Sequence, residues 1–293
     1  MVIYQSNGNE YKGNLHMHTT FSDGRLAPLE ALKAYEDAGF DFVAITDHRH
    51  VTRVPDYQGK MLLLNGIELD EEPSQAEVIH LLGIGFDADF EQHAPFEYTS
   101  QQGIDLIRRH GGLCFLAHPH WSMNRLHTIR PLTGLSGVEI YNSGSKPPYD
   151  AFRADSTHFL DLMAQDGFLY LTIACDDSHA YECELFDGFT LVQADSLTQD
   201  GILSALKAGR FYASQGPRFE RVVYEEGVAR VECSRVSRIA FHSNLAWANE
   251  RAYVGQGLTN ARHTVDARRG ESFIRVVIED EQGRKAWLNP FAV

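Results

Sequence analysis

The sequence contains few cysteines and no long apolar run, and these absences exclude several classes of protein. Its 293 residues include four cysteines, Cys114, Cys175, Cys183 and Cys233, and no two of them form a CxxC pair. A chain of this size with so little cysteine does not rely on a disulfide framework, so we expect reduced thiols. No run of 18 apolar residues occurs, and residues 1–7 lack the charged and apolar parts of a signal peptide. We therefore expect a cytoplasmic protein without a membrane span.

The sequence is also short of positive charge and of glycine-rich phosphate-binding loops. Lysine and arginine number 26 against 40 aspartates and glutamates, which gives a formal charge of -14. Surfaces that bind nucleic acid or anionic lipid use a general positive field, so we expect neither a nucleic-acid scaffold nor a membrane as a partner. No GxGxxG motif or P-loop follows the first expected strand, which disfavours nucleotide-cofactor folds.

What the sequence does contain is a change of pattern near residue 215. Residues 1–215 carry 14 basic and 30 acidic residues, whereas residues 216–293 carry 12 and 10. The first part alternates short apolar runs with amphipathic stretches, and the second holds β-branched or alternating segments separated by turns. We therefore predict two domains, 1–215 and 216–293, of which the second is a small all-β, sandwich-like domain.

The alternation in the first part predicts α/β architecture, with βα units around a parallel sheet. Seven or eight such units in about 200 residues fit a closed or nearly closed barrel better than an open doubly wound sheet. The expected strands cover 14–18, 41–46, 61–67, 78–85, 113–117, 137–141, 169–174 and 188–194. The expected helices include 28–38, 100–110, 150–166 and 201–209.

Histidine is concentrated in the first part, and its placement relative to the expected strands indicates a site. Twelve of the 14 histidines lie within residues 1–180. In a parallel barrel the carboxyl ends of the strands converge on one face, where active sites are built. Histidines and acids stand at or near those ends, namely His16, His18, His48, Glu68, His80, His118, Glu139, Asp177 and His179. His16 and His18 are two residues apart, so on a strand both side chains face the same ion.

The types of side chain narrow the choice of metal. Imidazole and carboxylate groups without thiolate suit Zn, Mn or Fe(II), whereas Mg and Ca prefer an all-oxygen shell. So many donors exceed what one tetrahedral ion needs, so we expect two or three ions. We interpret Asp47 as a partner that orients His48, and Glu139 either as a similar partner or as an acid in the barrel interior.

Five short segments between residues 13 and 179 carry most of these histidines and acids. They are residues 14–24 (NLHMHTTFSDG), 44–48 (AITDH), 66–68 (GIE), 117–119 (AHP) and 177–179 (DSH). Together they resemble the motifs of the PHP family, the polymerase and histidinol phosphatase group of metal-dependent phosphoesterases. The family's fold is a distorted (β/α)7 barrel, in agreement with the number of expected strands. Residues 208–217 (AGRFYASQGP) and the β-rich end resemble the subgroup that includes carbamate hydrolases of the CehA/McbA type.

The resemblance implies a trinuclear centre of divalent transition metals, Zn, Mn or Fe. The first metal position would use His16, His18, Glu68 and Asp177, the second Glu68 as a bridge with His80 and His118, and the third Asp23, His48 and His179. A hydroxide that bridges the first two ions would attack phosphorus, and the third ion would hold the phosphoryl oxygens. Candidates for moving the proton are Asp177, His179 and His120.

For the substrate we expect a small phosphate monoester or a (cyclic) phosphodiester. Candidate substrate-binding residues are cationic or imidazole side chains near the expected strand ends, namely Arg25, Arg49, His120, Arg125 and Lys146. His120 stands two residues after His118 on a segment that we expect to be extended, so its side chain would face the same end of the barrel as that of His118. Aromatic side chains that can stack on a ring are Trp121, Tyr141 and Tyr149.

Two alternatives to a phosphoesterase stay open at this point. The same metal site would serve a carbamate or amide hydrolase, as the resemblance of residues 208–217 suggests. A binding module with an inactive metal site is a different class, and the complete set of ligands argues against it. A nuclease is disfavoured because no basic stripe with interleaved aromatics is visible. A homo-oligomer is compatible with everything above.

Overall fold

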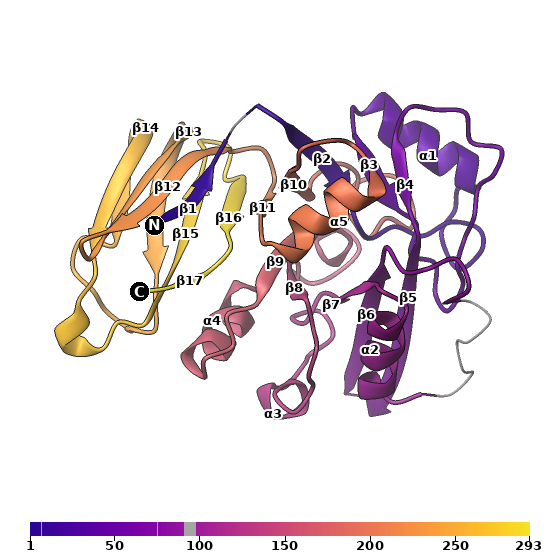
Figure 1. Cartoon of the computed structure of the whole chain (residues 1–293), viewed down its shortest axis with the longest axis horizontal. Helices are drawn as coiled ribbons and strands as arrows, with labels where there is room; N and C mark the ends of the chain where they lie inside the picture. The colour runs from indigo at the N-terminus through magenta and orange to yellow at the C-terminus, as the bar shows by residue number, and fades with distance from the viewer. Residues whose placement is uncertain (7, 75, 91–97) are drawn as a thin grey trace.

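The computed structural model describes residues 1–6, 8–74, 76–90 and 98–293, and it has mixed α/β architecture (Figure 1). The strands are β1 (Val2–Gln5), β2 (Glu10–Asn14), β3 (Phe42–Ala44), β4 (Leu62–Leu64), β5 (Gly66–Ser74), β6 (Glu77–Ile84), β7 (Leu113–Leu116), β8 (Gly137–Asn142), β9 (Leu171–Cys175), β10 (Phe189–Gln193), β11 (Phe211–Ser214), β12 (Phe219–Glu225), β13 (Val228–His242), β14 (Ala252–Thr264), β15 (Phe273–Glu279), β16 (Lys285–Leu288) and β17 (Phe291–Ala292). The α-helices are α1 (Pro28–Asp37), α2 (Ser100–Arg109), α3 (Leu126–Ile129), α4 (Thr157–Gln165) and α5 (Gln199–Lys207). In the described part of the chain, no helix has the length and apolar character needed to cross a membrane.

The strands form two sheets. The larger has 12 strands in the order β1-β12-β13-β15-β16-β11-β10-β2-β3-β4, with β14 beside β13 and β17 beside β15. The smaller has the order β5-β6-β7-β8-β9. Parallel ladders join β2 to β3, β3 to β4, β7 to β8 and β8 to β9, so the α/β prediction is confirmed. Among the described residues the ladders do not close into a barrel.

Single β-bridges span both seams between the sheets. One joins His48, just after β3, to Glu68 on β5, and the other joins Met17, after β2, to Ser178, after β9. Both bridges are parallel. They lie beside the predicted metal ligands, so the places where the two sheets meet are also the places where those ligands converge.

Strand β6 corrects the expectation of an all-parallel arrangement. It pairs antiparallel with β5 and with β7. A parallel crossover needs a dozen or more connecting residues, and the short link between β5 and β6 allows only a hairpin. As a result, His80 reaches the site from near the amino end of its strand and not from the carboxyl end.

The expected helix over 150–166 is shorter in the structure, where α4 begins at Thr157. Asp155 forms an antiparallel bridge with Tyr141, which keeps the preceding segment out of a helix. The short α4 still contacts the C-terminal strands. Its Asp161 accepts hydrogen bonds from the buried guanidinium of Arg275 on β15 and from Nδ1 of His242 on β13, the latter at 3.2 Å.

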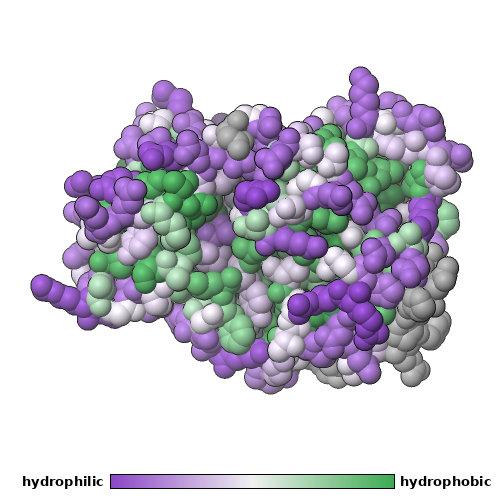
Figure 2. All heavy atoms as spheres, in the orientation of Figure 1, coloured by the Kyte–Doolittle hydropathy of each residue, from purple (hydrophilic) through white to green (hydrophobic). Residues whose placement is uncertain are grey.

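The C-terminal part is rich in β-strands, as predicted, and its strands pair antiparallel, but their ladder is not separate from that of the first part. Strand β16 pairs with β11, and the N-terminal β1 pairs with β12, so one ladder continues across residue 215 (Figure 1). Side chains from both parts also share one hydrophobic cluster, in which the ring of Trp287 stacks on Tyr141 with centroids 5.5 Å apart. On the face drawn in Figure 2, hydrophobic residues lie in several places among hydrophilic ones. The division of the chain at residue 215 stays a prediction.

Candidate metal centre

The nine predicted metal ligands converge where β2, β3, β5, β6, β7 and β9 meet. They fall into overlapping groups whose ligand atoms lie within 4.8 Å of one another. Those groups are His16, His18, Glu68 and Asp177; His18, Asp23, His48 and His179; His48, Glu68 and His80; and His16, His118 and Glu139. The first matches the first predicted metal position, and the second contains the third predicted position together with His18.

The first group is buried and has the geometry of a chelating site. Nε2 of His16 and Nε2 of His18 lie 3.2 Å apart. Both face Oδ1 of Asp177, at 3.0 and 3.1 Å, and Oε2 of Glu68, at 3.3 and 3.1 Å. Asp177 Oδ1 is buried and makes no hydrogen bond with the described residues. Two ring nitrogens and two carboxylate oxygens that point at one another in a buried space fit a divalent transition metal.

Glu68 presents its two carboxylate oxygens to different histidines. Oε2 faces His16, His18 and, at 3.4 Å, Nδ1 of His48. Oε1 faces Nδ1 of His80 at 2.9 Å and Nε2 of His118 at 3.4 Å. This arrangement suits a carboxylate that bridges two ions, as the resemblance implied.

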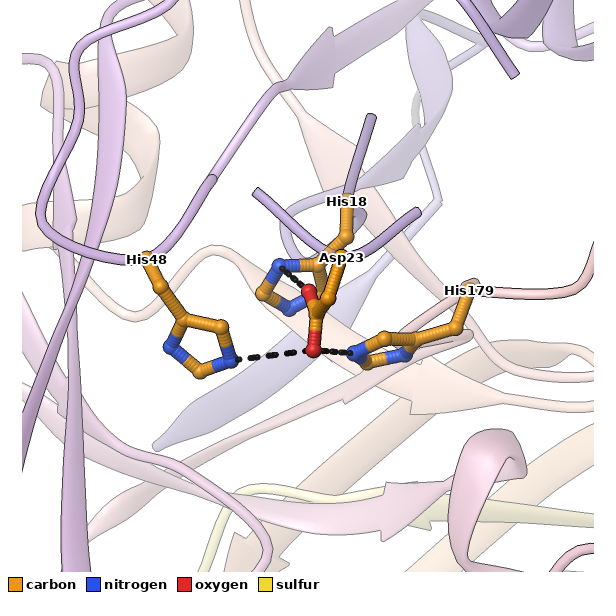
Figure 3. A group of neighbouring side chains, drawn as sticks. All are labelled: His18, Asp23, His48 and His179. Carbon is orange, nitrogen blue, oxygen red and sulfur yellow. Dashed lines mark ion pairs between the residues drawn. The ribbon is translucent and has the colours of Figure 1, made fainter. Parts of the chain in front are cut away.

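The second group, which contains the third predicted metal position, lies toward solvent and is drawn in Figure 3. Asp23 sits between three histidines that come from different segments. Its Oδ1 is 3.5 Å from Nδ1 of His18, and its Oδ2 is 3.3 Å from Nε2 of His179 and 3.8 Å from Nε2 of His48. Just over half of the Asp23 side chain is exposed, at 54%, whereas His18 is fully buried. This group therefore joins the buried ligands to the cavity.

Glu139 contacts two of the buried predicted ligands, His16 and His118, and orients them. Its Oε1 lies 3.3 Å from Nδ1 of His16, which leaves Nε2 of that ring to face the metal position. Its Oε2 accepts hydrogen bonds from the backbone N–H of His118 at 2.8 Å and from the side-chain amide of Asn142 at 2.9 Å. Of the two roles predicted for Glu139, the contacts match that of an orienting partner.

Asp47 has a different set of partners from the one expected. Its buried carboxylate accepts hydrogen bonds from the backbone and hydroxyl of Thr19 and from the hydroxyls of Ser22 and Thr52. Ser22 Oγ lies in turn 3.2 Å from Nδ1 of His18. Asp47 thus holds the loop after β2, and through Ser22 it fixes the ring of His18 and not that of His48.

Two ligands occupy a backbone conformation that side chains other than glycine seldom adopt. The φ angle is 26° at His118 and 51° at Asp177. Such a residue costs on the order of 1–3 kcal/mol and persists only where its surroundings enforce it. Strain of this kind is common at functional sites.

The buried imidazoles and carboxylates shift one another's pKa. Burial alone would lower the pKa of His16 and His18, but the neighbouring carboxylates Asp177 and Glu68 raise it. Burial would raise the pKa of both carboxyls, and the histidines hold it well below the usual range. For His179, Asp177 and Asp23 outweigh burial and raise the pKa to about 9. A divalent ion would take the place of these protons.

The cavity above these groups has a volume of about 290 Å³. Seven of the nine predicted ligands line it, and only His16 and His18 lie beneath its surface. The remaining lining residues are Trp121, Gly144, Ser145, Tyr149, Ala180 and Glu184. Sequence reasoning missed Glu184, whose buried carboxylate accepts hydrogen bonds from the backbone N–H groups of His179, Tyr181 and Glu182. No sequence signal separates it from the other acids of residues 181–187.

The four predicted anion-binding cations do not line this cavity. Each of them faces a carboxylate of its own: Arg25 with Glu182 at 3.3 Å, Arg49 with Asp70 at 2.8 Å, Arg125 with Glu77 at 4.0 Å, and Lys146 with Asp187. These partners come from distant positions in the sequence, so the pairing is visible only in the fold.

His120 is also absent from the lining of the cavity, because the segment after His118 is a turn. Ser122 N–H donates to the carbonyl of His118, and Asn124 N–H donates to that of Pro119. The expectation of an extended segment is therefore wrong here. His120 lines a neighbouring hollow, with Nδ1 2.9 Å from the carbonyl of Asp155.

Comparison with known proteins supports the fold more than the activity. No family model matches the chain. Over 78 residues it is 33% identical to the DNA polymerase/3'-5' exonuclease PolX of Bacillus subtilis, a match that covers 27% of this chain and 12% of that protein.

A crystal structure matches over nearly the full length. It is a two-domain protein from Bacteroides vulgatus, described as containing a predicted PHP-like metal-dependent phosphoesterase. The TM-score is 0.56 at 14% identity, and the match covers 99% of this chain and 97% of that one. This chain has a PHP-like fold.

Two further structures resemble parts of the PHP-like fold at TM-scores too low to support an argument. A protein from Bifidobacterium adolescentis described as a metal-dependent phosphoesterase gives 0.43 at 16% identity, over 57% of this chain and 87% of that one. An amidohydrolase from Chromobacterium violaceum gives 0.46 at 17% identity, over 68% and 96%.

Proposed function

We propose that the chain is a metal-dependent hydrolase that cleaves small phosphate monoesters or diesters. The observation that carries this proposal is the position of Glu68, whose two oxygens face two separate sets of histidines beneath a small cavity. The PHP-like fold is consistent with it. We also propose that β2, β3 and β5 to β9 correspond to the strands of a distorted (β/α)7 barrel, a reading that the two isolated bridges between the sheets support.

The residues of the chain would divide the work between them. His16, His18, Glu68 and Asp177 would hold one ion, Glu68, His80 and His118 a second, and Asp23, His48 and His179 a third. Zn, Mn or Fe ions bound there supply an activated water and a Lewis acid for the phosphoryl oxygens. Of the three residues predicted to move the proton, Asp177 and His179 line the cavity and His120 does not, so we keep the first two.

The test uses substrates that share one leaving group, p-nitrophenol, and differ in the group from which it is released: a phosphate monoester, a phosphate diester or a carbamate. The purified protein, loaded in turn with Zn, Mn or Fe(II), is assayed with p-nitrophenyl phosphate, bis(p-nitrophenyl) phosphate and a p-nitrophenyl carbamate. We expect turnover of a phosphate ester, two or three metal equivalents by elemental analysis, and loss of both metal and turnover in the double variant His16→Ala, His18→Ala.

Either of two results would overturn the proposal. Turnover of the carbamate without turnover of either phosphate would assign the site to a carbamate or amide hydrolase. Full phosphoesterase activity in the double histidine variant would show that the reaction takes place elsewhere in the molecule.

A further inference from the structure

Two aromatic side chains line the cavity, and one of them, Trp121, packs beside the residues of the second metal position. The indole of Trp121 packs nearly perpendicular to the imidazole of His118, with centroids 4.8 Å apart, and lies 5.9 Å from that of His80. Tyr149 lines the same cavity and is 41% exposed. The third aromatic considered from the sequence, Tyr141, instead stacks on Trp287. Trp121 and Tyr149 therefore provide the apolar ring surface next to the ligands.

The same cavity offers no side chain that would neutralise an additional anion. Its described lining contains neither lysine nor arginine. It does contain the carboxyl group of Glu184, which accepts hydrogen bonds from the backbone N–H groups of Tyr181 and Glu182. A second phosphate or a carboxylate on the substrate would meet this acidic side chain without a lysine or arginine to compensate for it.

The size of the cavity also favours a small substrate. About 290 Å³ lies at the lower end of the range for small-molecule sites. Such a space holds one ring together with the reacting phosphoryl group, and it is small for a dinucleotide or a polyphosphate.

We propose that Trp121 and Tyr149 bind an aromatic leaving group that carries no negative charge beyond that of the reacting ester. This proposal rests on the phosphoesterase function proposed above. In the reaction, water forms a new bond to phosphorus, the bond between phosphorus and the aryl oxygen breaks, and the departing phenolate takes up a proton.

The experiment measures how much each variant depends on the ring of the substrate. Metal-loaded wild type, Trp121→Ala, Tyr149→Ala and Trp121→Phe are assayed with phenyl phosphate, ethyl phosphate and 4-carboxyphenyl phosphate. The control is Trp247→Ala, because that side chain is an exposed aromatic in the loop between β13 and β14, outside the cavity lining. Binding of phenylphosphonate and methylphosphonate by calorimetry gives a second measurement that needs no turnover.

For Trp121→Ala we expect kcat/KM with phenyl phosphate to fall about tenfold relative to the value with ethyl phosphate, since ring contacts contribute on that scale. Trp121→Phe should recover most of this loss, and Trp247→Ala should behave as wild type. The wild type should prefer phenyl phosphate to 4-carboxyphenyl phosphate, and phenylphosphonate should bind more tightly than methylphosphonate only where the ring at position 121 is present.

Equal losses for the aryl and alkyl esters, or equal turnover of the carboxylated ester, would overturn this proposal while leaving the phosphoesterase intact. If no phosphate ester is cleaved, the proposed function fails. In that case phosphonate binding still tests whether Trp121 and Tyr149 bind an aromatic group. Equal binding of phenylphosphonate and methylphosphonate would overturn this proposal as well.

Discussion

Glu139 is not among the proposed metal ligands, yet it contacts two of them. It lies 3.3 Å from Nδ1 of His16 and accepts the backbone N–H of His118. We expect Glu139→Gln to lower the affinity for the most tightly bound ion about 10- to 100-fold, because outer partners fix the ring orientation and the basicity of a ligand. Competition with a chromophoric chelator measures this affinity.

Glu77→Gln is the matched control for that variant. Glu77 is also a buried glutamate, but it accepts hydrogen bonds from Arg125 and Thr128 beside α3. Wild-type metal affinity in Glu139→Gln, or an equal loss in both variants, would contradict the role assigned to Glu139.

Sequence reasoning reached the ligands more easily than their surroundings. The spacing of His16 and His18 and the order of the five motifs were sufficient to select eight of the nine residues that the fold brings together, and the family resemblance implied the ninth, His80. The role of the cationic side chains was harder to predict. Whether Arg49 is available to bind an anion depends on Asp70, which the fold places against it. His120 was predicted to face the site because side chains alternate along an extended segment. The chain turns after His118, so this alternation does not apply.

At the scale of elements, a buried contact between a histidine and a glutamate fixes the link between β14 and β15. Nε2 of His263 lies 3.0 Å from both carboxylate oxygens of Glu271, and the backbone N–H of Asp266 donates to the same carboxylate. Burial would raise the pKa of Glu271, but hydrogen bonds from Ser243, Asp266 and His263 lower it. Both side chains of the pair are 1% exposed.

This depressed pKa gives a testable dependence of stability on pH. The contribution of Glu271 is complete above the usual carboxyl pKa of 4.5 and is lost as the pH falls through its lower value in the folded state. We expect Glu271→Gln to reduce the free energy of unfolding by about 1–2 kcal/mol near neutral pH and to approach wild type in acid. Urea unfolding at a series of pH values measures this difference.

The control for this experiment is Glu226→Gln, which alters an exposed glutamate in the turn between β12 and β13. The free energy of unfolding of this variant should differ from that of wild type by the same small amount at every pH. A constant gap between Glu271→Gln and wild type down to pH 3 would contradict the assignment.

The direction of β6 shows why some elements could not be read from the sequence. Buried parallel strands and buried antiparallel strands both appear as short apolar runs, so the run at 78–85 predicted a strand without predicting its direction. The short link between β5 and β6 sets the antiparallel direction of the hairpin. The strand-helix alternation on either side was strong enough to give the α/β class.

For the whole molecule, the parts before and after residue 215 depend on each other. Ala213, Val277 and Trp287 belong to one hydrophobic cluster, and the amide of Asn289 donates to the carbonyls of Gly209 and Phe211. We expect a fragment of residues 1–215 to expose this apolar surface and to lose cooperative unfolding. Circular dichroism melting and limited proteolysis of the fragment and of the full chain test this expectation.

Addition of a separately produced fragment of residues 216–293 is the control for that comparison. Restored protection and a single melting transition in the mixture would show that the loss came from the missing partner. A fragment of residues 1–215 that melts cooperatively by itself would support the two independent domains predicted from the sequence.

The pairing of β1 with β12 also constrains how the protein is made. Val2 lies opposite Val223, so in the part of the chain that the structure describes β1 has no ladder partner until more than 200 further residues have been synthesised. At about 5–20 residues per second, that interval is roughly 10–40 s. During this time β1 waits unpaired, and the larger sheet is completed only once β17 has been synthesised.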